Sequence, residues 1–457
     1  MSSGLTPAQE ALLAQRLRGR AGGRSIPRAA AGPAPVTAEQ QQLLFHTWFT
    51  PADPLYNEAV TVLKDGPVDL DALRTAFAQL VDRHSIWRTT FVRRGGRSLQ
   101  VVGKAAEFPI PLYDLSGLPG EEQEATAAAL LTEQTLRPYD LDVGPLVRPL
   151  LVRFDAGHHR LFLSMHHLVF DGVSLYRVVL PELAVLYDAA VKGRPAGLPE
   201  PLQYADYASW QHDGALTEEL TRHLPYWREH LAGAPTLRLP LDHERPAARR
   251  FHGTTAWFTV PADVARRLQQ RGQDRGATLF QVLVAAFALL LHELTGDEEV
   301  VFATVADLRR RRELESMLGY CVTPVPLRLS VTPRFEELVD AARTEILDAL
   351  GHLLPFSKLV EDLNPPHPPG ANPVFQAMIV LEPQSPSPDP AWRLHQLDSR
   401  TGDALGQAKN DLHIELDQRP DGELSGRLIV TTDLFAPGFA TTTAQRWTSL
   451  LERLSGP

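Results

Sequence analysis

Residues 164–172 read Ser164-Met165-His166-His167-Leu168-Val169-Phe170-Asp171-Gly172, and the rest of the chain can be arranged around them. The apolar residues 161–163 before this stretch predict a short buried strand, so both histidines come where that strand ends. From residue 175 to 186 apolar side chains recur at helical spacing, which predicts a helix with Ser174 as its N-cap. A strand end that leads into a loop is a usual place for catalytic side chains because the scaffold behind it is rigid.

The histidine pair and the Asp-Gly that follows it form a candidate catalytic site. Histidine has its unperturbed pKa near neutrality, so His166 or His167 can take and return a proton at cellular pH. Asp171 lies too close in the sequence to act independently, so we expect it to hold the loop through a charge-assisted bond to an arginine. Gly172 is expected to adopt a backbone angle that costs other residues more. Two core histidines beside a turn are the alternative, but the combination of residue types favours catalysis.

Length and composition are those of a globular protein with two domains. The chain has 457 residues, 44% apolar and 22% charged, and this length fits two domains of roughly 200 residues. The formal net charge of -10 argues against a nucleic-acid partner. The single cysteine, Cys321, excludes a disulfide framework and a cysteine-ligated metal site, and it fits a reducing cytoplasm. The apolar run at 282–291 is too short to span a membrane, and we find no signal peptide, Gly-x-Ser-x-Gly elbow, phosphate-binding loop or His-Glu-x-x-His motif.

The order of predicted strands and helices indicates mixed α/β sheets covered by helices, in two halves of similar plan. In the first half, residues 69–82 have the pattern of an amphipathic helix. In the second half, a strand at 255–260 precedes a helix, and Thr278 caps a strongly apolar helix that Gly296 ends. Residues 1–35 lie ahead of both halves, and their arginines predict a basic docking tail or, as we favour, a solvated linker.

The stretch 166–172, His-His-x-x-x-Asp-Gly, resembles the signature of condensation domains of nonribosomal peptide synthetases and, more loosely, of chloramphenicol-acetyltransferase-like acyltransferases. Further motifs of condensation domains are matched in chain order by residues 36–41, 83–91, 204–210, 319–328, 355–363 and 409–412. The resemblance covers about residues 36–454. The sequence departs from the family pattern at Trp87 and at Thr323-Pro324, and these departures resemble the subgroup found beside polyketide modules.

The resemblance implies an α/β fold of two chloramphenicol-acetyltransferase-like lobes in a V-shaped pseudo-dimer, with the active site at the seam. It implies an N-terminal linker over residues 1–35, a first lobe over 36–214 and a second lobe over 215–457. In the family, the arginine at the position of Arg309 pairs with the motif aspartate. We therefore expect a structural ion pair between Asp171 and Arg309 across the seam.

The resemblance also implies acyl transfer between two carrier proteins. A donor acyl or peptidyl thioester and an acceptor, each on a phosphopantetheine arm, would meet at His167, with His166 orienting it and the Gly172 amide holding the oxyanion. The expected product is an amide in nonribosomal peptide or hybrid polyketide–peptide biosynthesis, or an ester if the acceptor is a hydroxyl. We expect no cofactor of the protein's own, no metal, no nucleic acid, no membrane, a monomeric state and a cytoplasmic location.

Three other functions stay open: a CoA-dependent acyltransferase of the same superfamily, an epimerisation domain, and a non-catalytic platform that recruits carrier or tailoring proteins. The later motifs speak against the first. Leu175 stands where epimerisation domains usually carry tryptophan, and His167, the histidine that recruitment domains usually lose, is intact. Because the sequence begins with Met1, we expect either a free-standing protein or an excised piece of a larger synthetase.

Overall fold

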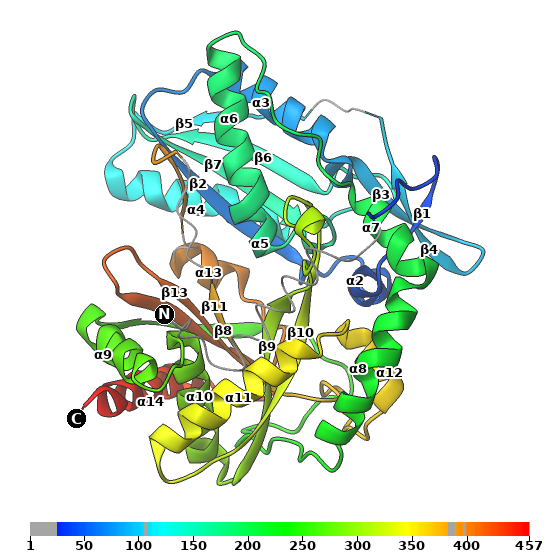
Figure 1. The fold of residues 1–457 in the computed structure, drawn as a ribbon. Coiled ribbons are helices and arrows are strands. Elements are labelled where there is room, and N and C mark those ends of the chain that lie inside the picture. Colours follow the sequence, from blue (N-terminus) through cyan, green and yellow to red (C-terminus); the bar gives the residue numbers. More distant parts are fainter. Residues whose placement is uncertain (1–24, 105–107, 383–388, 396–398, 457) are drawn as a thin grey trace, which may run out of the picture.

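The computed structural model describes residues 25–104, 108–382, 389–395 and 399–456. Figure 1 shows an upper lobe around a five-stranded sheet and a lower lobe around a six-stranded sheet. Arg28, near the start of the described chain, pairs with Glu200 at 2.6 Å, whereas most of the predicted basic tail lies outside the described residues. The chain is of the mixed α/β class, as the sequence predicts.

The sheet of the first lobe has the strand order β12-β2-β7-β6-β5. These strands are β2 (Asn57–Asp65), β5 (Leu112–Asp114), β6 (Val147–Arg153), β7 (His158–His166) and β12 (Trp392–His395). Helices α3 (Leu70–Arg83) and α6 (Leu180–Val191) cover one face, and α4 (Gly120–Leu136) covers the other (Figure 1). Leu161 and Leu163 of β7 pack in the core on one side, and Phe162 packs with α4 on the other. Burial on both faces explains why residues 161–163 are apolar without alternation.

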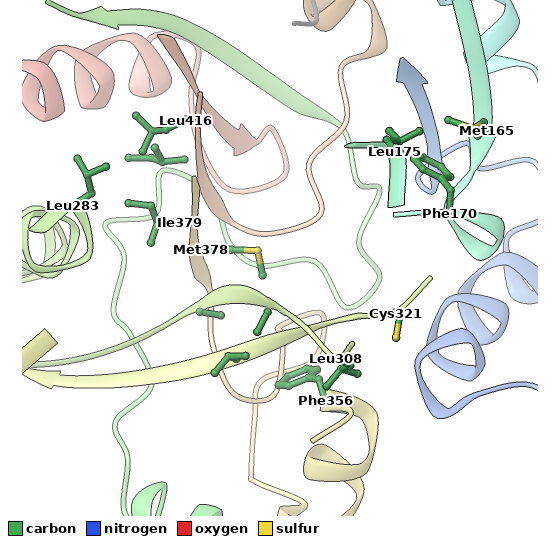
Figure 2. Close-up of a cluster of buried hydrophobic side chains, with 14 of the residues drawn as sticks. Met165, Phe170, Leu175, Leu283, Leu308, Cys321, Phe356, Met378, Ile379 and Leu416 are labelled. Carbon is green, nitrogen blue, oxygen red and sulfur yellow. The ribbon is translucent and has the colours of Figure 1, made fainter. Parts of the chain in front are cut away.

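The sheet of the second lobe has the order β10-β9-β11-β13-β14-β8. These strands are β8 (Gly253–Val260), β9 (Glu299–Asp307), β10 (Val322–Ser330), β11 (Ala377–Glu382), β13 (Leu412–Gln418) and β14 (Leu424–Thr431). The helices packed on it are α10 (Leu279–Thr295), α11 (Phe335–Gly351) and α14 (Phe439–Ser455), and α9 (Ala262–Gln273) packs against α10 and α14. Figure 2 shows Ile379 and Leu416 pointing toward Leu283 of α10, whereas Met378 points to the opposite face. That opposite face is turned toward the first lobe.

Shorter elements join the two lobes. A small sheet of order β1-β4-β3 contains β1 (Ala34–Pro35), β3 (Thr89–Arg94) and β4 (Arg97–Val102). The remaining helices are α2 (Ala38–Phe49), α5 (Gly172–Ser174), α7 (Tyr204–Trp210), α8 (Leu216–His230), α12 (Phe356–Leu363) and α13 (Ser399–Leu405). No helix in the part of the chain that the structure describes has the length and apolar character needed to cross a membrane.

Local sequence signals placed several helix ends correctly. Thr278 accepts a hydrogen bond from the Gln281 N–H and forms a capping box at the start of α10, and Gly296 ends α10 in the left-handed conformation at φ 75°. Thr37 caps α2 in the same way. The all-round apolar character of α10 follows from its position, because it is buried between the sheet and neighbouring helices.

One expectation about a helix end is wrong. Ser174 is not an N-cap: Asp171 is the cap, and its Oδ1 accepts from the Ser174 N–H at 2.8 Å. Oγ of Ser174 accepts in turn from the Asp171 N–H, which completes a capping box. The division of the chain at residue 214 stays a prediction, and one strand does not follow it. Strand β12, assigned to the second lobe, pairs antiparallel with β2 at the edge of the first sheet. The second half of the chain therefore crosses back to complete the first lobe.

Candidate active site

The β-sheet of the first lobe delivers the two histidines to the seam. His166 is the last residue of β7, and it pairs with Asn57 of β2. Its backbone N–H donates to Leu146 O at 3.0 Å, and the next N–H, that of His167, donates to Tyr56 O at 2.8 Å. Both peptide units are therefore fixed by neighbouring strands before the chain turns into α5.

His166 is a buried structural residue. Its Nδ1 accepts from the Leu168 N–H at 3.2 Å, so the proton is on Nε2, which lies 3.5 Å from Oγ1 of Thr47. The ring packs edge-on against Tyr139. Burial lowers the pKa of His166 to about 3, so the ring is neutral at pH 7. These contacts hold His166 in one orientation beneath its neighbour.

His167 lies at the seam with one nitrogen free. Its Nδ1 donates to Phe170 O at 3.0 Å, which assigns the proton to Nδ1 and leaves a lone pair on Nε2. The ring stacks on Phe170 and meets Tyr320 of the second lobe edge-on, with 5.0 Å between ring centres. Burial and the nearby Lys409 lower the pKa of His167 below its ordinary value. With 20% of its side chain exposed, neutral His167 has the form that a general base requires.

Asp171 and Arg309 form the ion pair that the sequence predicted across the seam. Oδ2 of Asp171 is 2.8 Å from Nη1 of Arg309, and both side chains are almost completely buried. The same oxygen accepts from the Cys321 N–H at 2.8 Å. Arg309 also donates to Gly319 O at 2.8 Å and to Met317 O at 3.2 Å. The pair therefore joins the loop after His167 to the loop that carries Tyr320.

Gly172 is not in the conformation that the sequence analysis expected. The left-handed glycines of the described chain do not include Gly172, which is the first residue of α5. A Cβ built on Gly172 would lie 3.4 Å from Oε2 of Glu382, which is an ordinary van der Waals contact with the second lobe. The first N–H groups of a helix lack partners within the helix. The Gly172 N–H therefore stays a candidate oxyanion donor.

Charged residues that the sequence analysis did not assign to the site lie opposite His167. Oε1 of Glu58, on β2, lies 3.8 Å from Nε2 of His167 and is bonded by Nζ of Lys409 from the second lobe. Further into the second lobe, Nδ1 of His413 lies 3.5 Å from Oε1 of Glu415, and Glu415 pairs with Arg427. The period-two order His413-x-Glu415-x-Asp417, alternating with the apolar residues Leu412, Ile414 and Leu416, was visible in the sequence. It predicts a strand with one charged face.

Other residues singled out in the sequence support the fold. Arg83 donates to Glu182, and Arg88 donates to three backbone carbonyls, those of Val81, Asp82 and Gly103. Cys321 is buried, and burial raises the pKa of its thiol, which makes it a poor nucleophile. Within residues 25–104, 108–382, 389–395 and 399–456, no group of His, Cys, Asp or Glu is arranged to hold a metal ion.

Comparison with known proteins agrees with this arrangement. The chain is 34% identical over 445 residues to phosphinothricin tripeptide synthetase PhsC of Streptomyces viridochromogenes, covering 95% of this chain and 40% of PhsC. It is 32% identical over 407 residues to malpinin synthetase of Mortierella alpina, covering 88% of this chain and 5% of that protein. A chain in the complex of the X-domain and OxyB from teicoplanin biosynthesis superposes with a TM-score of 0.77 at 27% identity, covering 95% of this chain and 96% of that chain.

The fold and the site define a two-lobed protein of the chloramphenicol-acetyltransferase-like class, with a histidine at the seam. The family model described as "Condensation domain" matches residues 30–456. The chain therefore belongs to the condensation-domain family, whose members occur in nonribosomal peptide synthetases. The chain spans 40% or less of the length of the two curated relatives named above.

Breaking the ion pair at the seam should destabilise the protein. Asp171→Ala leaves the buried guanidinium of Arg309 without its main partner, and we expect the free energy of unfolding to fall by about 3 kcal/mol. We expect a loss at the lower end of the range for buried ion pairs, because the carboxylate of Asp307, 3.0 Å from Arg309, remains as a partner. Urea denaturation measures this loss. The control Asp340→Ala, which breaks a partly exposed pair with Arg275, should cost less than about 1 kcal/mol. An unchanged stability in Asp171→Ala would contradict the structural role.

Burial of neutral His166 should make stability depend on pH. The pKa of His166 is about 3 in the folded protein, and an unfolded histidine has a pKa near 6.5. Between these values only the unfolded chain binds the proton, so the free energy of unfolding falls as pH drops from about 6.5 toward 3. Thermal melting between pH 7 and pH 5 measures the decline. His166→Gln, which cannot titrate, should show a shallower decline, and an equally steep one would contradict this account.

Proposed function

We propose that this protein joins a carrier-bound acyl or peptidyl thioester to the amine of a carrier-bound acceptor, forming an amide in nonribosomal peptide biosynthesis. The observation that carries the proposal is the free Nε2 of neutral His167, partly exposed at the seam of two lobes. In this proposal both substrates arrive on phosphopantetheine arms of carrier proteins, and the protein needs no cofactor of its own. The single cysteine, buried and unpaired, supports a cytoplasmic location.

The reaction assigns a specific task to His167. The acceptor nitrogen attacks the thioester carbonyl, which gives a tetrahedral intermediate with a negative oxygen and a positive nitrogen. His167 takes a proton from that nitrogen at Nε2, the carbon–sulfur bond breaks, and the proton passes to the departing thiolate. In this proposal the Gly172 N–H, which has no partner within α5, donates to the oxygen. Asp171 and Arg309 act through the position of the loop and do not touch the substrate.

A hydroxyl acceptor depends more strongly on the general base His167 than an amine acceptor does. A free α-amine has a pKa of roughly 7.7–8.0, so about a tenth is already neutral at pH 7 and can attack without prior activation. A hydroxyl must lose its proton as it attacks. His167 therefore contributes to amide formation mainly after the attack, and to ester formation during it.

A recruitment platform is the second candidate function. The similarity to a chain in the X-domain–OxyB complex, at 27% identity, favours it. A platform needs an exposed docking surface and no free base, whereas the described site keeps the Nε2 lone pair of His167 available. This feature supports the catalytic function over recruitment alone.

Removing His167 should harm ester formation more than amide formation. His167→Ala is expected to lower the rate with a hydroxyl acceptor by about 10²–10⁴, the usual contribution of a general base. The loss with a matched amine acceptor should be smaller. Mass spectrometry of carrier-bound products, with amine and hydroxyl acceptors of the same side chain, measures both rates.

The control for this experiment is His158→Ala, which removes an exposed histidine at the start of β7 and should leave both rates unchanged. Equal losses with the two acceptors in His167→Ala would reject the assigned task. Acyl transfer from acyl-CoA at the same rate as from an acyl-carrier would favour a CoA-dependent acyltransferase.

A further inference from the structure

Glu58 lies between the lobes beside the free nitrogen of His167. Its Oε1 is 3.8 Å from Nε2 of His167 and is also bonded by the ammonium group of Lys409. Lys409 comes from the second lobe, and its Nζ lies 6.0 Å from the ring centre of Tyr56. The side chains of Glu58 and Lys409 are 30% and 35% exposed, so the place is open to a ligand. A cation-binding site therefore lies next to the proposed base. The ammonium group of Lys409 occupies it.

His413 adds a second polar group to this place. It is 8% exposed, and its Nε2 has no hydrogen-bond partner among the described residues. Its Nδ1 faces Oε1 of Glu415 at 3.5 Å, so the proton belongs on Nδ1 and Nε2 carries a lone pair. His413 lies beside Met378 in the parallel register of β13 with β11, so its side chain is on the face of the second sheet that is turned toward the first lobe. Burial lowers the pKa of His413 to about 4. A buried acceptor nitrogen without a partner calls for a donor, and a ligand N–H would supply it.

The surrounding charges favour an added cation. Glu58 pairs with Lys409, and Glu415 pairs with Arg427, so these four charges balance. Glu382 adds a carboxyl group to the same face of the second sheet. Burial, with the nearby carboxylates Glu415 and Asp417, raises the pKa of Glu382 to about 8, so this group is largely protonated at pH 7. A ligand that brings a positive charge would favour its ionised form.

We propose that Glu58 and His413 form a subsite for the ammonium group of an aminoacyl acceptor, and that Lys409 fills this subsite until the acceptor arrives. The inference rests on the proposed condensation function and specifies its acceptor. The acceptor nitrogen donates to the Glu58 carboxylate and to Nε2 of His413, and it lies within reach of Nε2 of His167. Lys409 moves out toward solvent when the substrate takes its place.

The same subsite acts during bond formation. An ammonium group loses one proton to solvent before it can attack, and the nitrogen becomes positive again as the carbon–nitrogen bond forms. Glu58 stabilises that positive nitrogen until His167 removes the second proton. A hydroxyl acceptor brings no positive charge into the site and gains little from the Glu58 carboxylate. The subsite therefore selects amine over hydroxyl acceptors.

The test is a pair of variants that break the same ion pair from opposite sides. Glu58→Gln removes the carboxylate that binds the acceptor, and kcat/KM for an amine acceptor should fall about 10- to 100-fold, as for loss of a charged hydrogen bond. The matched hydroxyl acceptor should be much less affected. Lys409→Met removes the competing ammonium, so kcat/KM for the amine acceptor should rise. Both variants lose one ion pair, so their melting temperatures should shift alike.

Matched controls come from the exposed pair Lys358–Glu361 on α12, where Glu361→Gln and Lys358→Met should change neither acceptor's kinetics. A purely structural role for Glu58–Lys409 predicts losses in the same direction for both variants and both acceptors, and that result would overturn the subsite. If the wild-type protein forms product normally and Glu58→Gln lowers kcat/KM equally for the amine and the hydroxyl acceptor, the subsite is overturned. The proposed condensation function is then unaffected. A wild-type protein that forms neither product would overturn both.

Discussion

The geometry of the candidate active site depends on one buried ion pair between the lobes. Asp171, from the loop after β7, and Arg309, from the second lobe, are both shielded from water. A buried charge is costly unless it is paired and hydrogen-bonded, and here backbone groups complete the shell around both side chains. Separation of the lobes at this point would expose one charge to solvent or leave it buried without a partner. The pair also fixes the loop that places Tyr320 against His167.

Two adjacent residues of the same type have different tasks because their surroundings differ. His166 points into the first lobe, where burial and two hydrogen-bond partners keep it neutral and immobile. His167 points into the seam, where a backbone carbonyl holds one nitrogen and leaves the other free. β7 ends at His166 and a helical turn begins at His167, so the two side chains leave the backbone in different directions. One histidine therefore supports the position of the other.

The second sheet contributes both a core and a wall of the site. Leu412, Ile414 and Leu416 of β13 are fully buried against the helices, whereas the alternate residues His413 and Glu415 face the first lobe. A sheet face buried between two lobes would ordinarily be apolar, because charges placed there must be paired. The charged face, joined to the first lobe by Lys409 and Glu58, is what we interpret as a surface for a polar substrate group.

The sequence by itself determined the family, the α/β class, the strand that carries the histidines and helix ends such as that at Thr278, because these depend on local patterns within a few residues. The partner of Asp171 followed from a family resemblance. Only the tertiary structure decided that β12 returns to the first sheet, that Gly172 lies next to Glu382 of the second lobe, and that Glu58 and Lys409 meet beside His167. Those contacts join residues more than a hundred positions apart, and their geometry is set by how the lobes pack, which no local pattern encodes.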